Sequence, residues 1–225
     1  MLADLVEIGL AVGARNLVWV AAEFPMLFVL DIFGETTVAA FVISRRIWGI
    51  MNTPGWGFGL ASSSLVGQAL GSEDPAEAEA YARDIIRFSV GTYLVSAGLI
   101  AVFTPDIVAL FAESPMSPEV PIAVNLVHAA CIAVVFQGVS GGAAGPLDAA
   151  GDTTIPFASQ FVGMFLVAIP LAYLGATTAL GLWGLYLAFL AETSIPASIN
   201  YWRFRSGRWK AISEAYRPDP VAADD

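Results

Sequence analysis

Long apolar runs separated by short polar breaks dominate the chain. Six runs hold about 20 or more mostly apolar residues, the length that an α-helix needs to cross the hydrocarbon core of a bilayer. They cover approximately 8–30, 36–70, 87–111, 121–147, 155–176 and 180–202. The pattern predicts an all-α polytopic membrane protein with six transmembrane helices. We expect residues 1–210 to form one membrane lobe and residues 211–225 an acidic cytoplasmic tail.

Two segments depart from this simple pattern. The second run is longer than a straight crossing needs, so we expect it to tilt, kink or extend into water. The connection at 72–87, SEDPAEAEAYARDIIR, alternates charged and apolar residues. It predicts a separate helix on the membrane surface, with Ser72 or Asp74 as its N-cap.

Composition supports a membrane protein. Hydrophobic residues make up 57% of the chain and charged residues 13%, against about 25% charged residues in soluble domains. The net charge of −10 comes mostly from acids in loops and at the ends. These acids predict a solvated fringe, and a salt-adapted source is a second interpretation. A nucleic-acid partner is disfavoured because phosphate would be repelled.

The two ends and the cysteine count add further bounds. The first residues, MLADLVEIGL, lack a basic region and do not resemble a cleavable signal peptide. A chain that opens on a long apolar run is also compatible with being the downstream piece of a larger protein. The single cysteine, Cys131, excludes an intramolecular disulfide.

The basic residues predict the orientation. If all six runs cross, seven loop and tail cations fall on the side that holds both termini: Arg83, Arg87, Arg203, Arg205, Arg208, Lys210 and Arg217. The opposite loops hold none. The positive-inside rule then places both termini in the cytoplasm.

Small residues recur inside the second run. Steps of four give Gly55, Gly59, Ser63, Gly67 and Gly71, and a second set occurs at Gly138/Gly142 and Gly141/Gly145. Helices in lipid associate through close backbone approach along such small-residue faces. The stretch therefore predicts a packing stripe, with a kink near Pro54. A phosphate-binding loop is excluded because there is no preceding strand and no Gly-Lys-Ser/Thr ending.

Four stretches resemble the MATE (multidrug and toxic compound extrusion) family. The first is P-x-x-G-F-G-x-A-x-x-x-L-V-G-Q-x-L-G, which includes Pro54, Gly59, Gly67, Gln68 and Gly71. The others are residues 4–46, ending in A-A-x-x-I-x-x-R, residues 146–156 (PLDAAGDTTIP), with Gly151 and Asp152, and residues 180–209. Together they cover about residues 4–210 and are most similar to the C-terminal six-helix lobe of such a transporter.

The resemblance implies a function. It implies secondary active export of amphipathic or cationic organic compounds from the plasma membrane by H⁺ or Na⁺ antiport, with no cofactor beyond the coupling ion. Because family members have two six-helix lobes, it implies a second lobe on a separate chain, in a missing N-terminal half or in a second copy. The alternatives are a non-transporting fragment or assembly subunit, and a related flippase of lipid-linked sugars.

The sequence also departs from the family pattern. Asp148 replaces the usual basic residue of the L-R-G turn, so an ion pair made there is lost or reversed. The carboxylate that some members carry in the first helix of this lobe falls on Trp19, with Glu23 one turn further on. A second one, in the fourth helix, falls on Gln137.

Ionisable groups at membrane depth are costly, so each is examined for a role. Glu23 is either a cation or proton site facing a cavity, or a carboxylate paired with another helix. Arg46 is expected to face the cavity, with Arg45 pairing with Asp31 or Glu35 or reaching outward, and Arg15 is expected to be structural. Further candidates for the lining of the cavity are Asn16, Trp19, Gln137, His128 and, more weakly, Glu192.

No arrangement of residues predicts an enzyme or a metal site. The chain has one histidine and one cysteine, and it contains neither H-E-x-x-H nor G-x-S-x-G.

Overall fold

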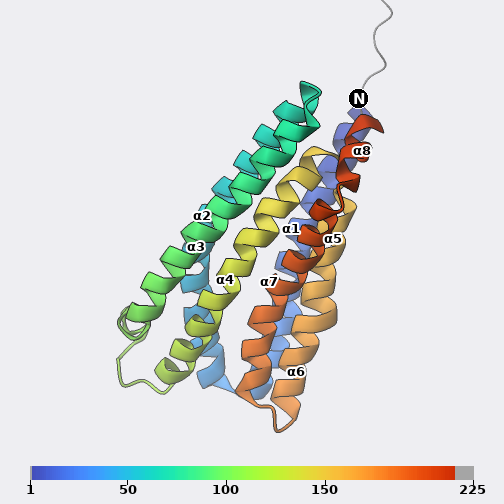
Figure 1. Cartoon of the computed structure of the whole chain (residues 1–225). Coiled ribbons are helices and arrows are strands. Elements are labelled where there is room, and N and C mark those ends of the chain that lie inside the picture. The colour runs from blue at the N-terminus through green and yellow to red at the C-terminus, as the bar shows by residue number, and fades with distance from the viewer. Residues whose placement is uncertain (1, 216–225) are drawn as a thin grey trace, which may run out of the picture.

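The computed structural model describes the backbone of residues 2–215, and this part is built from helices (Figure 1). The first four are α1 (Leu2–Phe33), α2 (Glu35–Gly71), α3 (Pro75–Phe111) and α4 (Glu119–Ala149). The fifth expected run is one helical rod made of α5 (Thr154–Phe161), the π-helix η1 (Val162–Ala168) and α6 (Ile169–Thr177). It is followed by α7 (Leu182–Arg205) and the short α8 (Arg208–Ala215).

Helix α4 forms the centre of the bundle. It packs against α2, α3 and α7, while α1 packs against the α5–α6 rod and α2. The start of α1, the start of α3, the end of α7 and α8 all lie at one end of the bundle (Figure 1). The clustering of the loop and tail cations at one end is therefore seen in space, apart from Arg217, which lies outside the described residues.

Glycines let α4 approach its neighbours closely. A Cβ atom placed on Gly138 would lie 2.7 Å from Tyr93 Cδ2, and one on Gly142 would lie 2.8 Å from Ile86 Cγ1. A Cβ on Gly145 would collide with Ser62, whose hydroxyl donates a hydrogen bond of 3.2 Å to the Gly142 carbonyl. Three of the four glycines in the second predicted set therefore form close helix contacts, whereas a Cβ on Gly141 would make only an ordinary contact.

Only part of the predicted stripe on α2 packs closely within the described residues, and the rest of it stays a prediction. Gly55 touches Tyr93, but a Cβ on Gly59 or Gly71 would meet no atom within 4 Å, and one on Gly67 would make only an ordinary contact. At 100° per residue, steps of four drift by about 40° each, so the five positions spiral about 160° around the helix. The buried face instead includes Ser62, Val66 and Ala69.

Within the described part of the chain, five segments are long and apolar enough to cross a membrane: Val12–Phe33, Pro75–Phe111, Val120–Ala149, Thr154–Thr177 and Leu182–Arg205. Helix α2 is not among them, because two arginines and the polar stretch after Met51 lower its hydropathy. It nevertheless packs along α3 and α4 as a helix of 37 residues with Pro54 inside it. A crossing by α2 stays a prediction.

The predicted surface helix at 72–87 is not separate. Residues from Pro75 onward are the first turns of α3, which continues without a break to Phe111. No glycine or proline interrupts the sequence between Pro75 and Gly91, so nothing in it ends the helix there. Asp74 is the N-cap, as predicted, and its carboxylate accepts hydrogen bonds from the amides of Ala76 and Glu77.

The turn after α4 is fixed by backbone conformation and by an ion pair. Gly151 has φ of 83°, and the amides of Gly151 and Asp152 donate to the carbonyls of Asp148 and Leu147. This is a Schellman ending, which favours glycine at the position with positive φ. Asp152, buried, forms an ion pair of 2.5 Å with Arg203 at the end of α7. The Gly151 and Asp152 motif thus joins two helices.

Candidate functional site: a charged pocket at mid-depth

Charged side chains from three helices meet at one depth in the bundle. Glu23 lies ten residues before the end of α1, Arg45 ten residues after the start of α2, and Glu192 ten residues after the start of α7. These three helix ends lie at the end of the bundle opposite the start of α1 (Figure 1). A rise of 1.5 Å per residue places the charges about 15 Å inside, near the middle of a bilayer core of about 30 Å.

These charges line a pocket with apolar walls. The pocket has a volume of about 290 Å³ and is formed by α1, α2, η1, α6 and α7. Its charged lining is Glu23, Arg45, Arg46 and Glu192, and its apolar lining is Ala22, Met26, Leu27, Phe41, Val42, Met164, Ala168 and Ile169. An apolar cavity with a few polar groups is the usual form of a small-molecule site.

Arg45 and Glu192 form a bidentate ion pair inside the pocket. Both guanidinium–carboxylate hydrogen bonds measure 2.7 Å, and the Glu192 side chain is 1% exposed. The Arg45 guanidinium carbon also lies 4.7 Å from the Phe189 ring centroid and 5.1 Å from that of Phe41. Paired, planar and stacked geometry of this kind offsets the desolvation of both charges. The predicted pairing of Arg45 with Asp31 or Glu35 is wrong.

The other two charges of the pocket differ from this pair. Glu23 and Arg46 are exposed, and neither forms an ion pair with any residue in the described part of the chain. Glu23 therefore presents a carboxylate that is open to a ligand, a proton or a metal cation. Arg46 lines the pocket, but Arg45 lines it as well, whereas the sequence predicts only Arg46 there.

A π-helical segment forms the remaining wall of the pocket. Met164 and Ala168 of η1 line it, and Ile169 follows them directly. The segment ends two residues before Pro170, which has no amide hydrogen to donate to the preceding turn and clashes with its carbonyl. That proline gives a local reason for i→i+5 hydrogen bonding, which occurs often at functional sites. The sequence predicts an uninterrupted α-helix in this region.

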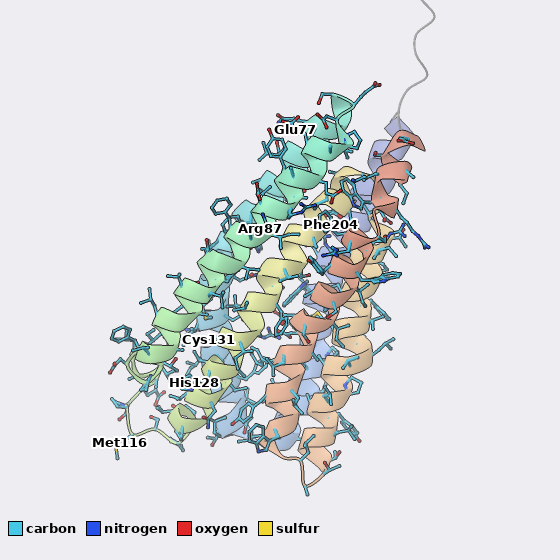
Figure 2. All side chains as sticks on the ribbon, viewed as in Figure 1. Glu77, Arg87, Met116, His128, Cys131 and Phe204 are labelled. Carbon is cyan, nitrogen blue, oxygen red and sulfur yellow. The ribbon has the colours of Figure 1, made fainter. Side chains whose placement is uncertain are left out.

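The remaining predicted residues do not converge on the pocket. Trp19 lies beside it, with its ring centroid 5.9 Å from the Arg45 guanidinium carbon. Asn16 is exposed on α1, nearer to the start of the helix than Glu23. Gln137 is half-buried on α4 and is not part of the lining. His128 is exposed in the first third of α4 (Figure 2), and its Nε2 lies 3.2 Å from the Ala101 carbonyl oxygen.

Two more polar contacts join the helices outside the pocket. Arg15 of α1 and Asp148 of α4 form an ion pair of 2.9 Å. Asp148 stands where the resemblance predicts a basic residue, so the charge at that turn is reversed, and the acidic side chain still forms an ion pair. Asn200 accepts a hydrogen bond of 2.9 Å from Ser159 and donates one of 3.3 Å to Ser140. Both contacts brace the lobe.

The motif residues of the second run have modest contacts. Pro54 is exposed inside α2, and the Gln68 amide donates a hydrogen bond of 3.2 Å to Ser64 on the same helix. Among the described residues, a Cβ atom on Gly59 or Gly71 would meet no atom within 4 Å, and one on Gly67 would lie 3.9 Å from the Ala149 Cβ. Among the side chains that the structure describes, no three from His, Cys, Asp or Glu gather to hold a metal ion.

The pocket and the fold can be set against known proteins. The MatE family model matches residues 11–174. The uncharacterized transporter YisQ of Bacillus subtilis is 24% identical over 211 residues, which are 92% of this chain and 46% of that protein. The probable multidrug resistance protein NorM of Caulobacter vibrioides is 29% identical over 213 residues, 93% of this chain and 45% of that protein.

Solved structures show the same fold. A MATE protein in complex with MaL6 superposes with a TM-score of 0.85 at 21% identity, covering 95% of this chain and 48% of that one. A MOP superfamily transporter from Pyrococcus furiosus, described as having a binding pocket of reverse polarity, gives 0.81 at 20% identity, covering 94% and 47%. The chain spans about half the length of the curated relatives it matches. The family match over most of its helices shows that this chain belongs to the MatE family, and it is not an enzyme.

Proposed function

We propose that the chain is one lobe of a secondary active transporter that exports amphipathic or cationic organic compounds. The observation that carries the proposal is the mid-depth pocket, where the Glu23 carboxylate has no ion-pair partner among the described residues and faces apolar walls. Transporters bind substrate and coupling ion near the bilayer midplane, between bundles that rock against each other. The names of the NorM relatives as multidrug resistance proteins support the same substrate class.

Glu23 is the residue that couples the two fluxes in this proposal. An ionised carboxylate binds an organic cation by charge, while Met26, Leu27 and Met164 contact its apolar part. A proton or Na⁺ arriving at the same carboxylate removes that attraction and releases the substrate. Competition for one group links movement of one ion to movement of the other.

The Arg45–Glu192 pair fixes the pocket while access changes. It ties α2 to α7 across the pocket, so both helices move as one body. Its charges neutralise each other, which leaves Glu23 and Arg46 to select the ligand. The whole lobe then rocks against a second lobe.

The partner and the orientation follow from the same reasoning. The chain resembles a C-terminal lobe and spans about half of its relatives, so we propose a second six-helix lobe, on another chain, in a longer polypeptide or in a second copy. The positive-inside rule places the arginine-rich end, with α8, at the cytoplasmic face of the plasma membrane.

Transport is tested in sealed vesicles. The chain is reconstituted alone, at a density that allows copies to pair, and together with any six-helix chain encoded beside it. An acidic or Na⁺-rich interior is imposed, and tetraphenylphosphonium uptake is followed. We expect uptake above that of protein-free vesicles, which an ionophore for the imposed gradient abolishes. If no gradient moves tetraphenylphosphonium in either preparation, the chain is a non-transporting fragment or assembly subunit.

A further inference from the structure

A second cavity lies at the end of the bundle that holds α8, far from the mid-depth pocket. It has a volume of about 580 Å³ and opens between α3 and the end of α7. Its lining is Glu79, Arg83, Ile86 and Arg87 of α3 with Tyr201, Phe204, Arg205 and Gly207. Arg87 and Phe204 lie at the same level on these two helices (Figure 2). We call this cavity the α3–α7 groove.

The groove is positively charged in an acidic protein. Three arginines and one glutamate line it, whereas the chain as a whole has a net charge of −10. Glu79 is already neutralised, because it pairs with both Arg83 and Lys210. The positive charge that remains is therefore concentrated on Arg87 and Arg205.

These two arginines are available to a ligand. Among the described residues, Arg87 forms an ion pair with Asp84 alone, at 3.2 Å, and both side chains are more than half exposed, so this pair contributes little to stability. Arg205 forms no ion pair or side-chain hydrogen bond within the described part of the chain, and Tyr201 adds a phenol beside it. Guanidinium groups in pairs are suited to binding the oxygens of a phosphate.

The groove has apolar lining beside its arginines, and an exposed apolar face of α3 continues beyond it. Arg83, Arg87, Val90 and Leu94 share one face of α3 by their spacing of three and four residues. Val90 and Leu94 lie outside the lining, and Leu94 is 57% exposed, while Ile86 and Phe204 line the groove and belong to a hydrophobic cluster. A ligand that fits has an anionic head and an apolar body, which favours a phospholipid over a soluble anion.

We propose that the α3–α7 groove binds the phosphodiester headgroup of an anionic phospholipid, with Arg87 and Arg205 as its ligands. Basic pockets between membrane helices bind such headgroups. Phe88 and Trp202 are both exposed, and each is next to an arginine in the sequence, Arg87 and Arg203 respectively. Aromatic side chains of this kind anchor proteins at the lipid interface. The site lies outside the transport pocket and does not depend on the proposed transport activity.

Native mass spectrometry of the purified full chain measures the binding. The probes are phosphatidylglycerol and phosphatidylcholine with identical acyl chains, and inorganic phosphate is the competing soluble anion. We expect phosphatidylglycerol to bind at least ten-fold more tightly than phosphatidylcholine. Each basic residue near a membrane surface contributes about five-fold in affinity, so R87Q/R205Q loses about 25-fold.

Two variants control for fold and for unspecific charge. R87K/R205K keeps both charges and retains most of the preference, and R208Q removes an exposed arginine at the same end that does not line the groove. R208Q should bind phosphatidylglycerol like the wild type. Circular dichroism of each variant checks that the helices are intact.

Three results would overturn the proposal. The first is equal affinity for the two lipids. The second is an equal loss in R208Q and R87Q/R205Q, which would mean diffuse attraction to the arginine-rich end. The third is displacement of phosphatidylglycerol by inorganic phosphate at equal concentration, which would make the groove a site for soluble anions.

Discussion

The Arg45 guanidinium and the Glu192 carboxylate are joined by two hydrogen bonds of 2.7 Å, in a part of the lobe that lies at mid-depth. The pair connects α2 to α7 and forms part of the wall of the pocket that contains Glu23. Its position explains how a chain with two adjacent arginines in an apolar environment folds. Arg45 is neutralised by Glu192 and stacked on aromatic rings, whereas Arg46 is exposed and lines the pocket.

Removing one member of this pair should destabilise the lobe strongly. E192Q leaves the Arg45 charge uncompensated, and loss of one partner of a buried pair costs about 3–5 kcal/mol. Unfolding in detergent, followed by circular dichroism, measures the change. R46Q is the matched control, because Arg46 has no ion-pair partner among the described residues, and it should change stability by less than about 1 kcal/mol. If E192Q and R46Q lowered the free energy of unfolding equally, the Arg45–Glu192 pair would stabilise the lobe no more than Arg46 does.

The Arg15–Asp148 pair predicts a charge-swap rescue. D148R places two arginines together at the turn after α4 and should lower stability, whereas R15D/D148R restores an ion pair with its members exchanged. Contacting residues have coupling energies of about 0.5–3 kcal/mol in a double-mutant cycle. Stability measured for R15D, D148R and the double variant gives this coupling. An additive result would show that the two side chains do not interact in the folded protein.

Glycines on α4 and α2 should respond in opposite ways to alanine. At Gly145 a Cβ atom would collide with Ser62, so G145A forces α2 and α4 apart, at a cost of about 1–3 kcal/mol. At Gly59 the Cβ meets nothing, so G59A should stabilise the helix by about 1 kcal/mol. Thermal unfolding of the two variants compares them. A loss of stability in G59A would mean that a partner outside this lobe covers that face of α2.

Gly151 should not tolerate a side chain. Its φ of 83° is costly for any residue with a Cβ, so G151A should lose about 1–2 kcal/mol and weaken the Asp152–Arg203 contact. Gly98 in α3 is a matched control, because its φ is helical and a Cβ there meets no atom within 4 Å. Unfolding midpoints report the difference. The Schellman assignment is contradicted if G151A and G98A behave alike.

The sequence predicts the helices of this lobe better than it predicts which face of each helix is buried. Apolar length alone located the helical runs, because bilayer thickness sets how many residues a crossing needs. The α2 stripe packs within this lobe over only part of its length, because spacing by four does not stay on one face of a helix with 3.6 residues per turn. The start of α3 at Asp74 was predicted, but the break expected near residue 87 was wrong, because charge density shows where a helix leaves lipid and not where it ends.

The site was only partly predictable. Glu23 and Arg46 stood out as charges in apolar runs, and both line the pocket. Glu192 ranked low and Arg45 received the wrong partner, because their contact joins residues 147 positions apart. The sequence did contain a signal for this pair. Arg45 and Glu192 each lie ten residues after the start of a helix, and both helices start on the same side of the membrane, so the two charges lie at the same depth. Which helices are neighbours had to come from the fold.

Binding of tetraphenylphosphonium to the purified chain most directly tests the claim that the mid-depth pocket is its cation site. Equilibrium dialysis with radiolabelled ligand compares wild type, E23Q and E35Q, the last being an exposed glutamate at the start of α2 outside the pocket. We predict saturable binding that weakens about ten-fold in E23Q, or ~1.4 kcal/mol, and is unchanged in E35Q. Binding that is equal in all three proteins, or absent from the wild type, would contradict the assignment.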